Sequence, residues 1–176
     1  MIMRRGQPLL LPASPLFITS SLVIALLLNM FLSGFFGASG VWLPDFLAVV
    51  LVFWNVHQPR RIGIGWAFFF GLLMDVHGSA LMGQHALAYS VLSYLAVSMH
   101  RRLRWFSLDG QAVQLIPVFA ASHLLQWAVR WVVGDGSPGW LALASPGLEA
   151  ILWPVVTAVL LMPQRRAHDP DENRPI

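Results

Sequence analysis

The feature that constrains this chain most is a series of six apolar stretches separated by short loops. The first contains about 20 apolar residues, enough for a helix to cross the roughly 30 Å hydrocarbon layer of a bilayer. Only 11% of the residues are charged and 57% are hydrophobic, whereas soluble domains carry about 25% charged residues. The sequence therefore predicts an all-α integral membrane protein. The expected transmembrane helices are 16–36, 42–56, 62–76, 80–99, 111–133 and 140–162.

The arginines predict the orientation of these helices. All eleven basic residues are Arg, and an even number of helices places both termini on one side. Ten of the arginines lie on that side, so the positive-inside rule makes it cytoplasmic. They are Arg4, Arg5, Arg60, Arg61, Arg101, Arg102, Arg104, Arg165, Arg166 and Arg174.

The same pattern divides the chain into three parts. Residues 1–15 are expected to be a cytoplasmic N-terminal tail, 16–162 the six-helix transmembrane domain, and 163–176 a disordered cytoplasmic tail. A signal peptide is the alternative for the first stretch. That stretch exceeds the usual apolar core of about 7–15 residues, which favours an uncleaved helix.

Several functions are disfavoured by what the sequence contains. The net charge is +3, but the arginines sit in pairs between apolar stretches rather than on one soluble face, so no nucleic-acid partner is expected. Cysteine is absent, and the chain has no recognisable dinucleotide, phosphate-binding, zinc-protease or serine-hydrolase motif. Of the six histidines, only His77 and His85 could approach each other. We therefore expect no catalytic site, cofactor or metal.

Asp75 is a candidate functional residue because acids near membrane helices are costly and often functional. The alternative is that it only caps the following segment or reaches headgroups. It ends one of two stripes of small residues, and such stripes let neighbouring helices approach closely in lipid. Both stripes are candidate surfaces for helix packing or for a partner. They consist of Gly63, Ala67 and Gly71, and of Gly83, Ala86 and Ser90.

Four charges form a candidate polar cluster in the outer half of the bundle: Asp45, Asp75, Arg130 and Glu149. A lone charge within a membrane helix costs at least about 2.5–3.5 kcal/mol, so Arg130 is expected to have a partner. Glu149 is the preferred partner because 111–133 and 140–162 are antiparallel neighbours, and Asp75 is the competing acid. A structural ion pair and a functional site both remain open.

A family resemblance adds to this interpretation. The run Gly71-Leu72-Leu73-Met74-Asp75, followed by 81–87, resembles the signature of the rod shape-determining protein MreD family. Pro44-Asp45, Trp54 and the Leu152-Trp153-Pro154 run fit the same pattern. Gly78 follows Asp75 by three positions where the family pattern has four, which leaves the geometry of that turn open.

The resemblance implies a non-enzymatic component of the bacterial cell-elongation machinery in the inner membrane, supporting lateral peptidoglycan synthesis and rod shape. The implied partners are an MreC-like scaffold and, indirectly, MreB, RodA and a class B penicillin-binding transpeptidase. The implied fold is similar to the substrate-binding subunits of energy-coupling-factor transporters. The alternative function is a vitamin-type transporter subunit. An intramembrane enzyme would need a nucleophile and base on adjacent helices, and the sequence neighbours Ser122 and His123 argue weakly against one.

Overall fold

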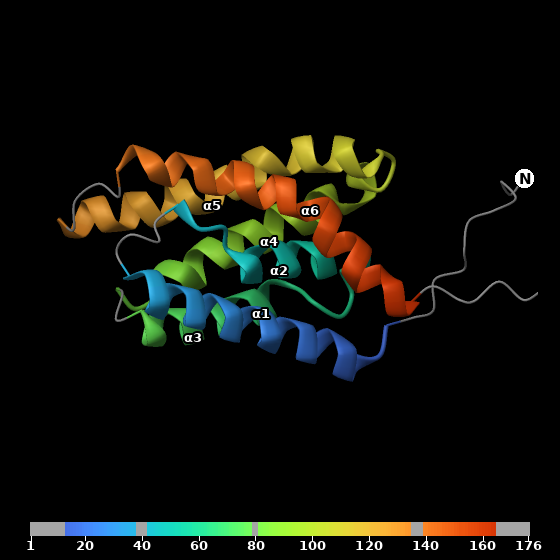
Figure 1. Ribbon diagram of the computed structural model, residues 1–176, viewed down its shortest axis with the longest axis horizontal. Coiled ribbons are helices and arrows are strands. Elements are labelled where there is room, and N and C mark those ends of the chain that lie inside the picture. Colours follow the sequence, from blue (N-terminus) through green and yellow to red (C-terminus); the bar gives the residue numbers. More distant parts are fainter. Residues whose placement is uncertain (1–12, 38–41, 79–80, 135–138, 165–176) are drawn as a thin grey trace, which may run out of the picture.

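The computed structural model describes residues 13–37, 42–78, 81–134 and 139–164, and within these ranges all regular structure is helical. The prediction of an all-α fold with six helices is confirmed for this part of the chain. The helices lie roughly along one long axis (Figure 1). Their bounds are α1 (Pro15–Phe36), α2 (Phe46–His57), α3 (Ile64–His77), α4 (Gln84–Leu103), α5 (Leu108–Val133) and α6 (Ser145–Leu161). Two short 3-10 helices, η2 (Trp140–Ala144) and η3 (Met162–Gln164), flank α6.

Local capping sets several helix starts that differ from the expected ones. The second helix begins at Phe46 rather than near residue 42, because Asp45 is its N-cap and accepts a hydrogen bond from the Ala48 N–H at 2.9 Å. An N-cap side chain satisfies a backbone donor that the first turn leaves free. The fifth helix begins earlier than expected, at Leu108, because Ser107 caps it in the same way.

Two further helices, like the second, begin later in the sequence than expected. The fourth helix begins at Gln84 instead of 80, after Gly83 adopts a left-handed conformation with φ 101°. A side chain at this position would strain the backbone, whereas glycine tolerates it. The sixth begins at Ser145 instead of 140, since residues 140–144 form η2.

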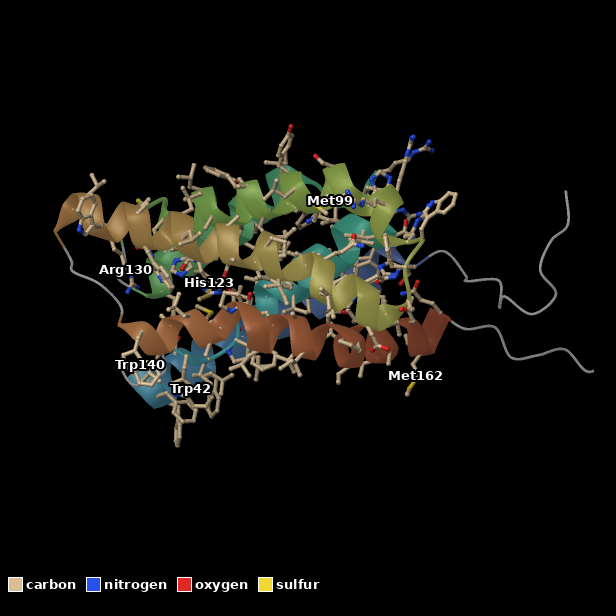
Figure 2. The ribbon with its side chains drawn as sticks, turned by 90° about the horizontal axis from the view of Figure 1, so that it is seen from above. Trp42, Met99, His123, Arg130, Trp140 and Met162 are labelled. Atoms are coloured by element: carbon tan, nitrogen blue, oxygen red, sulfur yellow. The ribbon has the colours of Figure 1, made fainter. Side chains whose placement is uncertain are left out.

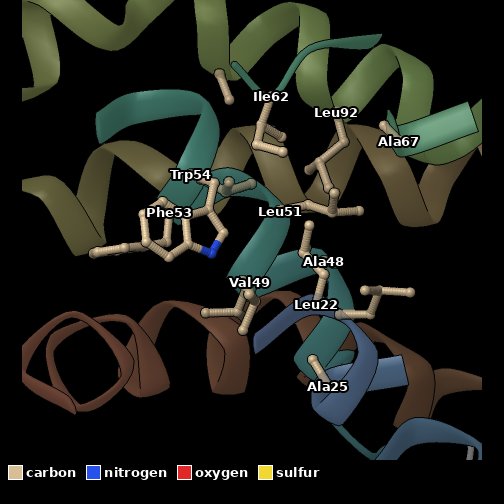
Figure 3. Packing of buried hydrophobic residues seen from close by; sticks show 14 of the residues in the cluster. Leu22, Ala25, Ala48, Val49, Leu51, Phe53, Trp54, Ile62, Ala67 and Leu92 are labelled. Atoms are coloured by element: carbon tan, nitrogen blue, oxygen red, sulfur yellow. The ribbon is translucent and has the colours of Figure 1, made fainter. Parts of the chain in front are cut away.

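Helix α2 is the centre of the bundle. Every residue from Leu47 to Val56 is buried, because α1, α4 and α6 all pack against this one short helix. Figure 3 shows Val49, Leu51 and Phe53 of α2 amid side chains from the surrounding helices. Fully buried helices are apolar on all sides, and α2 follows this pattern with one polar exception, Asn55.

Two side chains of α2 donate hydrogen bonds to other helices, while the Asn55 Oδ1 atom has no hydrogen-bond partner among the described residues. The Asn55 side-chain amide donates to the Ser93 hydroxyl at 2.7 Å, and the Trp54 indole N–H donates to the Ser21 hydroxyl at 2.8 Å. Trp54 is therefore a fully buried core residue, although its position near a helix end is typical of an interfacial anchor. These two bonds join α2 to α4 and to α1.

The two stripes of small residues meet each other where α3 packs on α4. A Cβ atom added at Gly71 would lie 2.6 Å from the backbone nitrogen of Ala86, so these two backbones touch. Ala67 and Ala86 are both fully buried, while Gly63 is the N-cap of α3 and Gly83 the N-cap of α4. Ser90 is half-buried and donates to the Ala86 carbonyl at 2.7 Å. At Gly71 and Ala86, then, the stripes serve internal packing and leave no room for a partner helix.

The bundle has two distinct ends (Figure 2). We call the end that carries Trp42 and Trp140 the distal end, and the end that carries Met99 and Met162 the terminal end. The described chain begins and finishes at the terminal end (Figure 1). Arg4, Arg5, Arg165, Arg166 and Arg174 lie outside the described residues, as do most of the two expected tails.

Three helical segments are long and apolar enough to cross a membrane: Pro15–Phe36, Leu108–Val133 and Trp140–Gln164. Helices α2 and α3 are apolar but shorter. The length of α3, 14 residues, corresponds to about 21 Å at 1.5 Å per residue, as the sequence predicts for this segment. The crossing of the bilayer by all six helices stays a prediction.

Candidate functional site

Glu149 is the most deeply buried acid of the described residues, with no exposed surface. It lies in the second turn of α6, where its Oε1 atom is 2.7 Å from His123 Nε2 on α5. The same oxygen accepts a hydrogen bond from the backbone N–H of Asp45 at 3.0 Å. The other carboxyl oxygen, Oε2, is buried and has no hydrogen-bond partner among the described residues. Buried polar atoms are rarely left unpaired, which makes Glu149 the first residue to consider for function.

Asp45 connects Glu149 to two more helices. Its Oδ1 atom accepts from the Asn29 amide of α1, and its Oδ2 atom accepts from the Tyr89 hydroxyl of α4. The Asn29 carbonyl oxygen accepts in return from the Phe46 N–H at 3.0 Å. Asp45 therefore caps its own helix and binds two others with the same carboxylate.

We call these five side chains the distal polar network: Asn29, Asp45, Tyr89, His123 and Glu149. They come from α1, the N-cap of α2, α4, α5 and α6. His123 lies toward the end that carries Trp140 and Trp42 (Figure 2). Lipid offers no hydrogen bonds to replace a lost partner, so the network favours one fixed arrangement of these five helices.

Asp75 occupies a separate but adjoining place. Its carboxylate accepts from the backbone N–H groups of Gly83 at 2.9 Å, His85 at 2.8 Å and Ala86 at 3.2 Å. It also lies 2.8 Å from His85 Nδ1. An acid placed at a helix N-terminus satisfies free donors and complements the helix dipole. The structure thus agrees with the capping interpretation: Asp75, at the end of α3, holds the first turn of α4.

His85 lies between Asp75 and the distal polar network. Its ring packs edge-on against the Tyr89 ring, with centroids 5.9 Å apart, and Tyr89 is bound to Asp45. Of the four residues expected to cluster, Asp45 and Glu149 are in direct contact, and Asp75 reaches them only through His85 and Tyr89. The three acids are therefore connected in a chain of contacts across the bundle rather than gathered in one cluster.

The expected pair of Arg130 with Glu149 is not formed. Among the described residues, the two acid–base contacts are His85–Asp75 and His123–Glu149, so His123 takes the place expected for Arg130. Arg130 lies seven residues further along α5, about 10.5 Å along the helix axis, and is half-buried. Residues 140–144 form η2, so Glu149 lies within two turns of the start of α6.

Sequence reasoning missed three members of the network, Asn29, Tyr89 and His123. Asn29 carries a signal that could have been used, since it is the one side-chain amide within the apolar stretch 16–36, and such a group must find a partner in protein. Tyr89 carries no comparable signal, because tyrosines also sit at interfaces.

The geometry of the network suits binding and positioning more than chemistry on a substrate. The Tyr89 hydroxyl is committed to Asp45 and the His123 ring to Glu149. Within the described ranges, no group of three or more His, Cys, Asp or Glu side chains could hold a metal ion. What the arrangement does provide is a fixed relation between the distal ends of five helices.

Comparison with known proteins identifies the family. The family model described as rod shape-determining protein MreD matches residues 13–163. A curated relative, the rod shape-determining protein MreD of Haemophilus influenzae (strain ATCC 51907 / DSM 11121 / KW20 / Rd), is 28% identical over 123 residues, covering 70% of this chain and 76% of the relative. No solved structure matches. The chain belongs to the MreD family, whose members determine rod shape, and it is a transmembrane protein.

Proposed function

We propose, from this family membership, that the protein is a non-enzymatic part of the cell-elongation machinery in the bacterial inner membrane. In this role it binds an MreC-like scaffold and supports lateral peptidoglycan synthesis. MreB, RodA and a class B penicillin-binding transpeptidase are its indirect partners. Six membrane crossings with both termini in the cytoplasm complete the proposal.

The observation that carries this proposal is the family match across residues 13–163, which spans all six helices. A role in rod shape follows from the family itself. The finer role is supported by the architecture, because the described loops are short and the bulk of the described chain is helical. A protein built in this way meets its partners through helix faces and short loops.

The distal polar network supports a role as a rigid scaffold more than a role that requires the helices to move. It joins α1, α2, α4, α5 and α6 by hydrogen bonds that a lipid environment would not replace. The exposed apolar residues of α1 and α3, such as Ile24, Phe31 and Phe69, are then presented on a fixed framework. Such a framework lowers the entropic cost of binding another membrane helix.

The test is depletion and capture in the bacterium that encodes the chain. Depleted cells are expected to become round and swollen, and a tagged copy is expected to restore rods and to co-purify with an MreC-like protein from native membranes. Gly71→Val, which disturbs the α3–α4 contact, should fail to restore rods. Gly65→Val lies on the same helix with open space around it and should restore them.

The transporter alternative makes the opposite prediction. Depleted cells would keep their rod shape, one nutrient would cure a growth defect, and the purified protein would retain a small molecule. The two open cavities described for the structure are lined by the last residues of α2 and α4 and by the residues that follow them at the terminal end, with no residue of the distal polar network in either. Rod-shaped depleted cells that a vitamin restores to growth would refute the scaffold proposal.

A further inference from the structure

An open pocket at the terminal end is lined by arginines from two separate segments. Arg60 follows α2, whereas Arg101 and Arg104 come from the end of α4. The cavity measures about 470 Å³, and His57 and His100 also line it. Three cationic side chains, from two segments far apart in the sequence, thus line one accessible space.

An adjoining pocket extends this space toward an aromatic side chain. It shares Arg101 and Arg104 with the first and adds Trp105. The side chain of Trp105 is 89% exposed. We call the two together the terminal pocket.

The arginines of the terminal pocket have no acidic partner in the part of the chain that the structure describes, where both acid–base contacts involve histidine. Basic residues in the last turn of α4 suit the helix dipole and the positive-inside rule. The packing of α2 against α4 then brings Arg60, which follows α2, to the same cavity as Arg101 and Arg104. Cations gathered around a space without a carboxylate repel one another unless an anion enters.

The chemistry of the lining selects the kind of anion. The guanidinium group presents a planar fork of donors that matches phosphate in a bidentate way. The two histidines use Nδ1 toward backbone carbonyls, His57 to Phe53 and His100 to Val97, so their neutral forms offer no further donor. Arginine therefore supplies the recognition, and a phosphate or a carboxylate group fits it.

The position of the pocket favours a phosphate group and indicates its source. Trp105 and its neighbour Phe106 are both exposed beside the pocket, and exposed aromatic residues at helix ends of membrane proteins lie at the level of lipid headgroups. We propose that the terminal pocket binds the phosphate group of an anionic phospholipid through Arg60, Arg101 and Arg104. Basic pockets between membrane helices on the cytoplasmic side hold lipid headgroups in this manner.

The test uses the full-length chain, purified in a neutral detergent and stripped of native lipid. Phosphatidylglycerol is titrated at physiological salt and binding is measured by native mass spectrometry. Arg101→Gln and Arg104→Gln are compared with Arg102→Gln, a matched control, because Arg102 is an exposed arginine on the same helix that does not line the pocket. Each variant removes one charge, and circular dichroism verifies that each remains folded.

Each pocket variant is expected to weaken phosphatidylglycerol binding by about tenfold or more, since a hydrogen bond to a charged group is worth about 1.5–3 kcal/mol. The Arg102→Gln control is expected to change binding by less than about twofold, because Arg102 does not line the pocket and exposed charges outside a site contribute little. Phosphatidylcholine, which has no net charge, should bind weakly to all forms.

Three results would overturn the proposal. An equal loss of phosphatidylglycerol binding in all three arginine variants would show general electrostatic attraction rather than a specific binding site. Inorganic phosphate that displaces the lipid at low concentration, or binds as tightly, would assign the pocket to a soluble ligand. Phosphatidylglycerol binding no tighter than phosphatidylcholine binding in the unsubstituted chain would show that the pocket does not select an anionic lipid.

Discussion

The contact between α3 and α4 at Gly71 should be among the least tolerant positions of the chain. A Cβ atom there would lie 2.6 Å from the Ala86 nitrogen and 2.8 Å from the His85 carbonyl carbon, whereas unstrained contacts between carbon atoms are about 3.5–4.0 Å. Valine at this position would therefore push the two helices apart by about 1 Å. The hydrogen bonds that Asp75 accepts across this contact now measure 2.8, 2.9 and 3.2 Å, and the displacement would weaken them.

The magnitude follows from two known costs. Overpacking a well-packed core typically costs about 1–3 kcal/mol, and loss of a helix cap costs about 0.5–2 kcal/mol. Valine regains only a few tenths of a kcal/mol from its better helix propensity. We expect Gly71→Val to lower the free energy of unfolding by about 3 kcal/mol, or roughly 6–12 °C in the unfolding midpoint for a chain of this size.

The assay is thermal unfolding of the purified protein in detergent, with Gly65→Val as the matched control. Gly65 is on the same helix, and an added Cβ there meets no heavy atom within 4 Å. Its substitution should change the free energy of unfolding by less than about 0.5 kcal/mol, the usual range for surface changes. If the two variants unfold at the same temperature, the close approach of α3 and α4 is not a constraint, and the reasoning fails.

Two further predictions concern the buried acid and the topology. In a double-mutant cycle on stability in detergent, Glu149→Gln and His123→Gln should be non-additive, with a coupling of about 0.5–3 kcal/mol. Glu149→Gln and Arg130→Gln should be additive within about 0.5 kcal/mol. The reverse pattern would show that Glu149 pairs with Arg130 rather than with His123. A reporter active only in the periplasm should be silent when fused after Arg166 and active when inserted at Ser137, because ten of eleven arginines lie on one side. The opposite result would invert the proposed orientation.

The sequence predicted the helices well because each apolar stretch is bounded by local signals. The stretches 16–36 and 62–76 correspond closely to α1 and α3. The starts of α2 and α5 differ from the expected ones because the side chains of Asp45 and Ser107 cap these helices. Caps depend on one side chain and its backbone conformation, so hydropathy alone does not locate them.

The candidate site was predicted only in part, because partner choice depends on how helices pack. Asp45 and Glu149 were identified by their charge, but the histidine that contacts Glu149 was assigned no partner in advance. Arg130 was paired with Glu149 because 111–133 and 140–162 are antiparallel neighbours, but that relation does not decide which side chain of α5 contacts Glu149, and the contact is His123. Helix packing also determines what the stripes of small residues contact. A stripe shows that something can approach closely, and in this bundle Gly71 and Ala86 approach each other.

The hydrogen bond between the Asp45 N–H and Glu149 joins residues that are 104 positions apart in the chain. Synthesis at about 5–20 residues per second would put an interval of roughly 5–20 s between the two. During that interval the first turn of α2 lacks its hydrogen bond to Glu149, because α6 has not yet been synthesised. A chain that stops before α6 leaves His123 unpaired and one side of α2 uncovered. An incomplete chain would therefore expose polar groups that the complete bundle buries.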